Sequence, residues 1–202
     1  CKPGVELTGI VTDADTGEPI AGAVVGEGWV LDKAVRSDAA GRYMNEEYQR
    51  TARSPLAQRA VHKVVTMLGD GDRVLAHCFA GKDRTGFTIA VVLEAAGVDR
   101  DAVMADFLAS NAAVPELRAH IVNTIRNQMS DTPEVTEVAE ARLTDAVLGV
   151  QEAYLDSAHG AIIEDFGSLD GYLDAAGLTR DDVVKLRAAL RALAHEGLIE
   201  QV

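Results

Sequence analysis

The chain has 202 residues, of which 48% are hydrophobic, and a formal net charge of −13. A hydrophobic fraction of this size excludes wholesale disorder, and the negative charge excludes a surface that attracts nucleic acid. We therefore expect one folded domain with at most a small second unit, and no nucleic-acid partner. No apolar stretch reaches the ~18 residues of a membrane-spanning helix, so no integral membrane segment is predicted.

The first 42 residues have the texture of a β-rich segment. Short β-branched runs at residues 8–13, 21–25, 29–31 and 34–37 are separated by Gly, Asp and Pro. This pattern is typical of strands joined by tight turns. The chain begins with Cys1 in place of Met, which indicates a fragment or a processed form. A mature N-terminus carrying a lipid on Cys1 would begin in the same way.

From residue 43 onward the hydrophobic pattern has the period of helices. Apolar residues over 56–68 lie on one helical face, with Pro55 before them and Gly69 after them. Residues 70–72 read as a turn, 73–77 as a buried strand, and 85–96 as an apolar central helix closed by Gly97. Further helix starts are marked by Asp99, Pro115, Pro133, Ser168 and Thr179. The pattern predicts an α/β fold that is mostly helical after residue 43.

Residues 77–86, His-Cys-Phe-Ala-Gly-Lys-Asp-Arg-Thr-Gly, connect the predicted strand to the central helix. The first-turn N–H groups of a helix are unpaired and the helix dipole is positive there. A glycine-containing loop above them predicts a cradle for an anion the size of phosphate. The nucleotide-binding P-loop is excluded, because Ala76 stands where that motif needs glycine and Asp83 follows the lysine.

Cys78 and Arg84 are the predicted centre of the chemistry in this loop. Helix N-termini lower a thiol pKa from about 8.5 to roughly 3.5–7.5, so Cys78 is expected to be a nucleophilic thiolate. The planar guanidinium of Arg84 matches two phosphate oxygens. Asp83 is the nearest candidate for the general acid and base, and Thr85 can hydrogen-bond the departing thiolate.

The rest of the loop is predicted to hold the substrate. Lys82 adds a second cation, which would favour substrates with more than one phosphate, and His77 is expected to order the loop by hydrogen bonding. The predicted substrate-binding residues are Phe79, Ala80, Gly81, Lys82 and Gly86. An upstream acid is the alternative to Asp83, with four candidates: Glu46, Glu47, Asp70 and Asp72.

Each of these residues also has a common structural role that involves no catalysis. A lone cysteine is usually a small buried hydrophobe, and a Lys-Asp-Arg run is usually a solvated turn. The order His-Cys, five residues, Arg-Thr-Gly has a chance expectation on the order of one in ten thousand in a chain of this length. Its position between a strand and a buried helix favours function further.

These residues resemble the Cys-x5-Arg-Ser/Thr signature of the protein tyrosine phosphatase superfamily, and most of all its bacterial tyrosine and phosphoinositide phosphatases of the mycobacterial type. The likeness covers about residues 41–195, and outside the loop it includes residues 43–44, 47–48, 57–60, 110–111, 114–115, 167–169 and 172–173. The resemblance implies a hydrolase with a phosphocysteine intermediate on Cys78, phosphate binding by Arg84 and acid catalysis by Asp83. It also implies phosphotyrosine and phosphoinositide substrates.

The resemblance also suggests how the chain is divided. Residues 1–42 resemble part of a carboxypeptidase-regulatory β-sandwich, through the Gly-Glu-Pro-Ile-Ala-Gly-Ala turn and the Asp-x-x-Gly-Arg-Tyr ending. Residues 43–202 would be a phosphatase domain without the family's usual N-terminal strands. Residues 128–155 would form the family's lid, with core packing as the alternative for Met129, Val135, Val138, Leu143, Val147 and Leu148.

Two other classes of protein compete with the phosphatase. An arsenate reductase uses a similar anion loop but needs further resolving cysteines, and only Cys1 is available. A non-catalytic module would bind phosphorylated ligands, or nothing, through a truncated phosphatase fold. The remaining histidines lack metal-ligand spacing, so we expect no metal and no cofactor. The expected location is cytoplasmic or secreted, and the sequence does not predict an oligomeric state.

Overall fold

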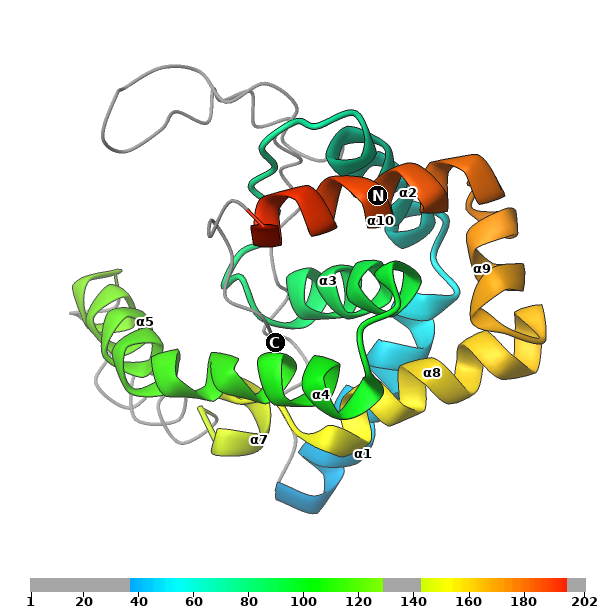
Figure 1. Cartoon of the computed structure of the whole chain (residues 1–202). Coiled ribbons are helices and arrows are strands. Elements are labelled where there is room, and N and C mark those ends of the chain that lie inside the picture. Colours follow the sequence, from blue (N-terminus) through cyan, green and yellow to red (C-terminus); the bar gives the residue numbers. More distant parts are fainter. Residues whose placement is uncertain (1–36, 129–142, 196–202) are drawn as a thin grey trace, which may run out of the picture.

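The structure is a computed structural model that describes residues 37–128 and 143–195 (Figure 1). The described residues are mostly helical and include no β-strand. The helices are α1 (Ser37–Ala52), α2 (Pro55–Gly69), α3 (Asp83–Ala96), α4 (Arg100–Ala109), the 3-10 turn η2 (Ser110–Ala113), α5 (Val114–Gln128), α7 (Asp145–Leu148), α8 (Glu152–Phe166), α9 (Leu169–Ala175) and α10 (Arg180–His195).

The predicted β-rich segment falls largely outside the described residues, which begin at Ser37. Helix α1 begins at that residue, so the last residues of the 1–42 segment are helical. The sequence pattern placed the start of the helical part at residue 43. In the structure the helical part begins earlier, at Ser37.

Most predicted helix starts and ends are confirmed, because their signals act within one turn. Ser54 caps α2 by accepting a hydrogen bond from the Leu56 amide, and Pro55 occupies the first turn. Asp99 and Ser168 cap α4 and α9 in the same way. Gly97 closes α3 with a left-handed φ of 93°, which glycine adopts without steric cost. The start predicted at Pro133 lies outside the described residues.

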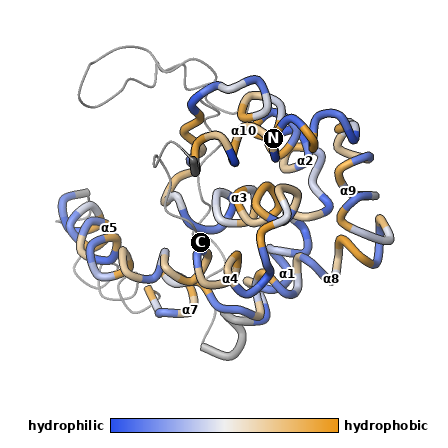
Figure 2. Tube along the Cα trace, in the orientation of Figure 1, coloured by the Kyte–Doolittle hydropathy of each residue, from blue (hydrophilic) through white to orange (hydrophobic). Residues whose placement is uncertain are grey.

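Helix α3 is the central element, as its apolar composition predicts. It contacts α2 and α10 on one side, and α1 and α4 on the other (Figure 1). Hydrophobic residues lie along much of α3 (Figure 2). A helix surrounded in this way is held in place by packing on several sides, which makes its N-terminus a rigid platform.

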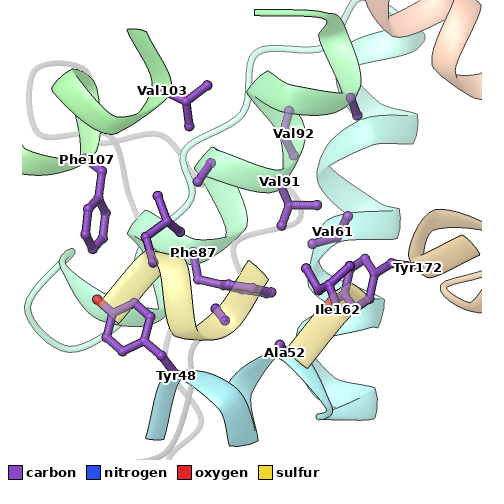
Figure 3. Packing of buried hydrophobic residues seen from close by; sticks show 14 of the residues in the cluster. Tyr48, Ala52, Val61, Phe87, Val91, Val92, Val103, Phe107, Ile162 and Tyr172 are labelled. Atoms are coloured by element: carbon purple, nitrogen blue, oxygen red, sulfur yellow. The ribbon is translucent and has the colours of Figure 1, made fainter. Parts of the chain in front are cut away.

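The main core is built from aromatic rings around α3 (Figure 3). Phe87 of α3 meets Tyr172 of α9 edge-on at 6.3 Å between ring centroids, and Tyr48 of α1 meets Phe107 of α4 at 6.0 Å. All four rings are buried to 2% exposure or less. Such pairs prefer edge-to-face geometry because the ring edge is positive and the face negative.

A smaller apolar cluster joins α5 to α7. Its buried members are Ile125, Leu143 and Leu148, and partly buried residues of α5 surround them. Figure 1 shows α5 extending away from the helices around α3. The turn that carries α7 packs against α5 and α1, and it is also held by polar contacts described below.

The predicted strand at residues 73–77 is wrong for the described part of the chain. The backbone from 72 to 78 is irregular, and no described residue pairs with it as a strand. Val74 and Ala76 pack against the core, whereas Leu75 between them is 52% exposed. Side chains of residues 74–76 therefore alternate between the core and the surface, as in a strand. A strand also requires a hydrogen-bonded neighbour, however.

Candidate active site

The loop at residues 78–82 leads directly into the N-terminus of α3. Gly81 adopts a φ of +65°, a left-handed conformation that favours glycine and reverses the chain. Lys82 is the N-cap residue of α3 and makes no side-chain capping bond. No Lys82 side-chain bond therefore caps the first turn of α3, where the helix dipole favours an anion.

The Cys78 thiol lies within this ring of amides. Burial by itself raises the pKa of the thiol, but hydrogen bonds from the Thr85 hydroxyl and from the backbone amides of Thr85, Lys82 and Ala80 lower the pKa below its ordinary value. The Thr85 hydroxyl is buried and forms no well-aligned hydrogen bond with any described residue, so it can turn towards the sulfur. Thr85 and the loop amides therefore favour the charged form of the sulfur.

A cavity of about 480 Å³ opens beside the sulfur, and Cys78, Arg84 and Thr85 all contribute to its wall. Much of the remaining wall is apolar and comes from α2 and from residues 74–76. Leu56, predicted to lie on the buried face of α2, is 70% exposed and borders this cavity instead. The nucleophile and guanidinium residues predicted from the sequence therefore share one cavity.

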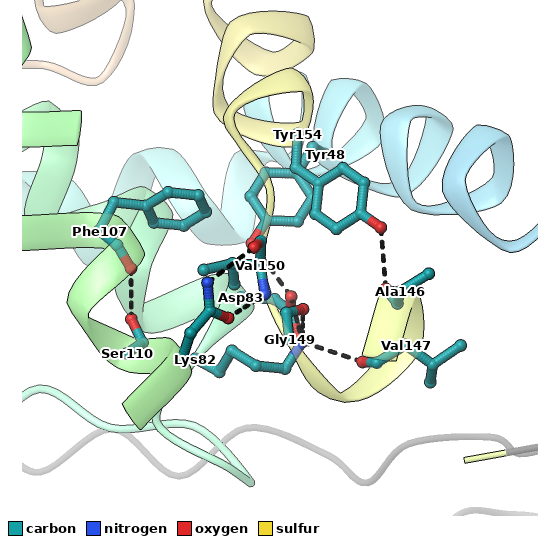
Figure 4. A network of polar contacts seen from close by, with 11 residues as sticks. Tyr48, Lys82, Asp83, Phe107, Ser110, Ala146, Val147, Gly149, Val150 and Tyr154 are labelled. Carbon is teal, nitrogen blue, oxygen red and sulfur yellow. Dashed lines mark hydrogen bonds and ion pairs between the residues drawn. The ribbon is translucent and has the colours of Figure 1, made fainter. Parts of the chain in front are cut away.

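Lys82 and Asp83 face a different part of the molecule (Figure 4). The Lys82 ammonium donates to Asp83 Oδ1 at 2.7 Å and to the backbone carbonyls of Val147 and Gly149 at 3.1 Å each. The Tyr48 hydroxyl donates to the same Asp83 oxygen at 3.0 Å. Neither Lys82 nor Asp83 borders the cavity that holds Cys78.

Two buried phenols complete this network. Burial, followed by the Asp83 carboxylate, raises the pKa of both Tyr48 and Tyr154. Both hydroxyls therefore stay protonated and act as donors, Tyr48 to Asp83 and Tyr154 to the carbonyl of Ala146 at 2.8 Å. Asn111 adds a third link, exchanging two hydrogen bonds with the backbone of Val150.

The network was not recognised from the sequence as part of the site. Tyr48 lies 35 residues from Asp83, and the carbonyl acceptors of Lys82 lie 65 and 67 residues from it. A signal was present, because Tyr48 and Asn111 are among the positions that share the family likeness outside the loop. Tyr48 and Asn111 both belong to the network around Lys82 and Asp83, on the side of the loop away from the cavity.

The other predicted loop residues occupy varied positions. His77 Nδ1 lies 3.0 Å from the carbonyl oxygen of Cys78. Phe79 is 66% exposed, and Ala80 is also at the surface. The Gly86 amide donates to the carbonyl of Lys82 at 2.7 Å, and an added Cβ at Gly86 would come within 2.9 Å of the Phe107 ring. Their roles in substrate binding stay predictions.

The alternative acids do not border the cavity, and the named residues of the predicted lid that the structure describes are buried. Glu47 pairs with Arg50, while Glu46, Asp70 and Asp72 are exposed and do not border the cavity. In the predicted lid, Leu143, Val147 and Leu148 are buried. Its other named residues, Met129, Val135 and Val138, lie outside the described part of the chain.

The histidines outside the loop include two with hydrogen-bond partners. His62 contacts the carbonyl of Ala176 at 3.1 Å, and His159 lies 3.2 Å from the guanidinium of Arg100. Within residues 37–128 and 143–195, no group of three or more side chains is arranged to hold a metal ion. In the same ranges, no helix has the length and apolar character needed to cross a bilayer.

Comparison with known proteins decides the family. The model of the tyrosine phosphatase family matches residues 24–192 of this chain. The chain belongs to the tyrosine phosphatase family. The match includes the loop with Cys78 and Arg84, and also α1 with Tyr48 and the turn that carries α7.

Relatives of this phosphatase family member come from several bacteria. The chain is 52% identical over 157 residues to the triple specificity protein phosphatase PtpB of Mycobacterium tuberculosis, covering 76% of this chain and 56% of PtpB. It is 38% identical over 117 residues to a Cupriavidus necator protein whose name describes it as a tyrosine-protein phosphatase, covering 58% and 39%. A tyrosine-protein phosphatase of Nostoc commune is 28% identical over 124 residues, covering 58% and 38%. The chain thus spans about half or less of the length of the curated relatives it matches.

Proposed function

We propose that the chain hydrolyses phosphomonoesters through a phosphocysteine intermediate on Cys78, with phosphotyrosine and phosphoinositides as substrates. One observation carries the proposal: Cys78, Arg84 and Thr85 line one cavity, at the N-terminus of α3, where Thr85 and the loop amides lower the pKa of the Cys78 thiol despite its burial. A thiol with a lowered pKa, in a cavity that is also lined by an arginine, is equipped to attack phosphorus as the thiolate.

The reaction has two balanced steps. In the first, the Cys78 thiolate attacks phosphorus, an S–P bond forms, and the bond from phosphorus to the ester oxygen breaks. The leaving oxygen takes a proton and departs as the alcohol or phenol. In the second, water gives up a proton to the group that protonated the leaving oxygen and attacks phosphorus, the S–P bond breaks, and inorganic phosphate leaves with the thiolate restored. Arg84 and the loop amides would hold the phosphoryl oxygens in both steps.

Asp83 is our proposed source of the proton for the leaving oxygen. Its carboxylate is turned towards Tyr48 and Lys82 and does not border the cavity, so its side chain would have to rotate towards Cys78 to reach the ester oxygen. Loss of an acid matters most for a poor leaving group. We therefore expect Asp83→Ala to reduce the hydrolysis of phosphotyrosine more than that of para-nitrophenyl phosphate. Equal losses on both substrates would assign the proton to another group.

The substrate classes rest on the relatives and on the cavity. The name of the PtpB relative states a triple specificity, and 76% of this chain aligns with it. The apolar wall formed by α2 beside Cys78 suits an aromatic ring attached to phosphate. Within the predicted lid at residues 128–155, Leu143, Leu148 and Tyr154 are buried in the two apolar clusters, which supports the alternative of core packing for residues 143–155.

Hydrolysis of para-nitrophenyl phosphate tests the proposal directly. Wild type should turn over this substrate, and Cys78→Ser should be inactive while it keeps the same thermal melting temperature. Lys185→Met is a suitable control, because its ammonium lies on α10 and pairs with Asp181 at 3.0 Å. If the wild-type protein hydrolyses the substrate no faster than folded Cys78→Ser, the proposal that the chain is an enzyme is refuted.

A non-catalytic phosphate-binding module is the second candidate. The observation that favours it is the absence of a strand partner for residues 73–77 among the described residues, since an unsupported edge weakens the platform of the loop. Vanadate and phosphate separate the two candidates when turnover is absent. A rise in melting temperature without hydrolysis would indicate the binding module, and neither effect would indicate an inert fold.

A further inference from the structure

The Lys82 ammonium has a complete set of partners below the loop. A lysine ammonium has three N–H donors, and this one meets three acceptors: Asp83 Oδ1 and the carbonyls of Val147 and Gly149. The side chain is 8% exposed (Figure 4). A buried cation is tolerated only when it is paired and hydrogen-bonded in this way. The three contacts therefore fix the side chain of Lys82 in one place.

The backbone of the same residue faces the reacting thiol. The Lys82 amide is one of the groups that lower the pKa of the Cys78 thiol, and the Lys82 carbonyl accepts from the Gly86 amide at 2.7 Å. Lys82 thus connects three parts of the molecule: the turn at residues 147–149, the first turn of α3, and the sulfur. Because its side chain is anchored on one side of the loop, its amide is held towards the other side.

We propose that Lys82 is a positioning residue, whose ammonium clamps the loop to the turn at residues 147–149 and so holds the Lys82 amide against the Cys78 sulfur. The inference rests on the proposed function only in taking Cys78 as the reacting thiol. It differs from the sequence-based expectation that Lys82 binds a second phosphate. All three of its donors are engaged below the loop, so none is left for a substrate in the cavity.

The acceptor side of this clamp can be altered without touching the loop. Gly149 supplies one of the carbonyls, and an added Cβ at this position would meet the Asp145 carbonyl oxygen at 2.8 Å and Asn111 Oδ1 at 2.9 Å. Neither the Asp145 backbone nor Asn111, which is bonded to Val150, can move aside easily. Gly149→Ala therefore displaces the acceptors of Lys82 while every charge in the protein stays the same.

The ionisation of Cys78 tests the clamp from both sides. In a Cys1→Ser background, Cys78 is the only thiol, and the pH dependence of its alkylation by iodoacetamide gives its pKa. We expect Lys82→Met and Gly149→Ala each to raise this pKa by about one unit, the effect of weakening one hydrogen bond to a charged group. Lys185→Met removes the same charge from exposed α10 and should leave the pKa unchanged.

Two outcomes would overturn the inference. One is an unchanged Cys78 pKa in folded Lys82→Met or Gly149→Ala. Should Lys82→Met fail to fold, Gly149→Ala decides alone, because it keeps the lysine and its charge. A shift in Lys82→Met without one in Gly149→Ala would mean that the charge acts directly on the thiol. That result also contradicts the clamp.

Substrate comparison gives a second, independent readout. A clamp predicts that Lys82→Met lowers kcat/KM by the same factor for para-nitrophenyl phosphate and for a phosphoinositide with two phosphates on its ring. A selective loss on the doubly phosphorylated substrate would place Lys82 in the cavity as a substrate ligand and refute the clamp. The alkylation experiment needs no turnover, so failure of the clamp and failure of the proposed hydrolase are distinguishable.

Discussion

Removal of the Thr85 hydroxyl is the sharpest test of how the loop ionises Cys78. Thr85→Val keeps the shape of the side chain and deletes one of the donors that lower the pKa of the thiol. A hydrogen bond to a charged group contributes about 1.5–3 kcal/mol, and about 1.4 kcal/mol corresponds to one pKa unit. The thiol is only partly buried, so water replaces some of the lost interaction, and we expect an upward shift of about one unit.

The shift is measured by the pH dependence of iodoacetamide alkylation in a Cys1→Ser background. Thr88→Val is the matched control, because Thr88 is one turn further along α3 and its hydroxyl donates to the Arg84 carbonyl at 2.8 Å. The control should leave the thiol pKa where it is in wild type. If Thr85→Val titrates like wild type, the hydroxyl does not act on the sulfur and the ionisation of Cys78 has another origin.

The same variant has a pH-dependent effect on stability. The pKa of Cys78 is lower in the folded protein than in the unfolded chain, so the thiolate stabilises the fold above the unfolded pKa of about 8.5. This contribution is lost as the pH falls through the folded pKa. Thr85→Val should therefore cost more stability in urea unfolding at about pH 9.5 than below the folded pKa. A cost that is the same at both pH values would contradict the linkage.

Three further substitutions probe the support of the loop. Gly86→Ala places a methyl group 2.9 Å from the Phe107 ring and should lower the unfolding free energy by about 1–3 kcal/mol in urea melts; a wild-type midpoint would mean that the ring moves freely. Tyr48→Phe removes the donor to Asp83 and should cost about 1 kcal/mol in the same assay, and a neutral result would show that this hydrogen bond adds nothing to stability. Arg84→Lys loses the planar fork that binds two phosphate oxygens and should lower kcat/KM for para-nitrophenyl phosphate about 100-fold, whereas near-wild-type activity would exclude bidentate binding.

The features predicted well from the sequence are those whose cause is local. Ser54 and Pro55 define the start of α2, and Gly97 closes α3, because caps act within one turn of the chain. The apolar composition of residues 85–96 predicts a central helix, since a helix without a polar face can be stable only when it is surrounded. Cys78 and Thr85 are separated by one short loop and lie close together in the sequence, so their proximity also follows from local geometry.

The features predicted poorly depend on distant partners. Residues 73–77 have the composition of a buried strand, yet a strand is defined by its neighbours, and none is present among the described residues. Lys82 reads as a loop cation aimed at substrate, but its acceptors come from a turn far along the chain. Composition alone does not show that two backbone carbonyls will arrive beneath the loop.

The link that Lys82 makes between the loop of Cys78 and the turn at residues 147–149 suggests why the family likeness extends beyond the signature loop. A helix N-terminus can stabilise an anion only if the amides above it keep their orientation, and a loop of a few residues cannot ensure this alone. In this chain the orientation depends on Lys82, and Lys82 depends on carbonyls that Asn111 holds in place through Val150. A signature loop on a fold without that turn would have the same sequence. It would lose the support that orients the Lys82 amide towards the thiol. Gly149→Ala reproduces that situation in a single substitution, with the loop sequence unchanged.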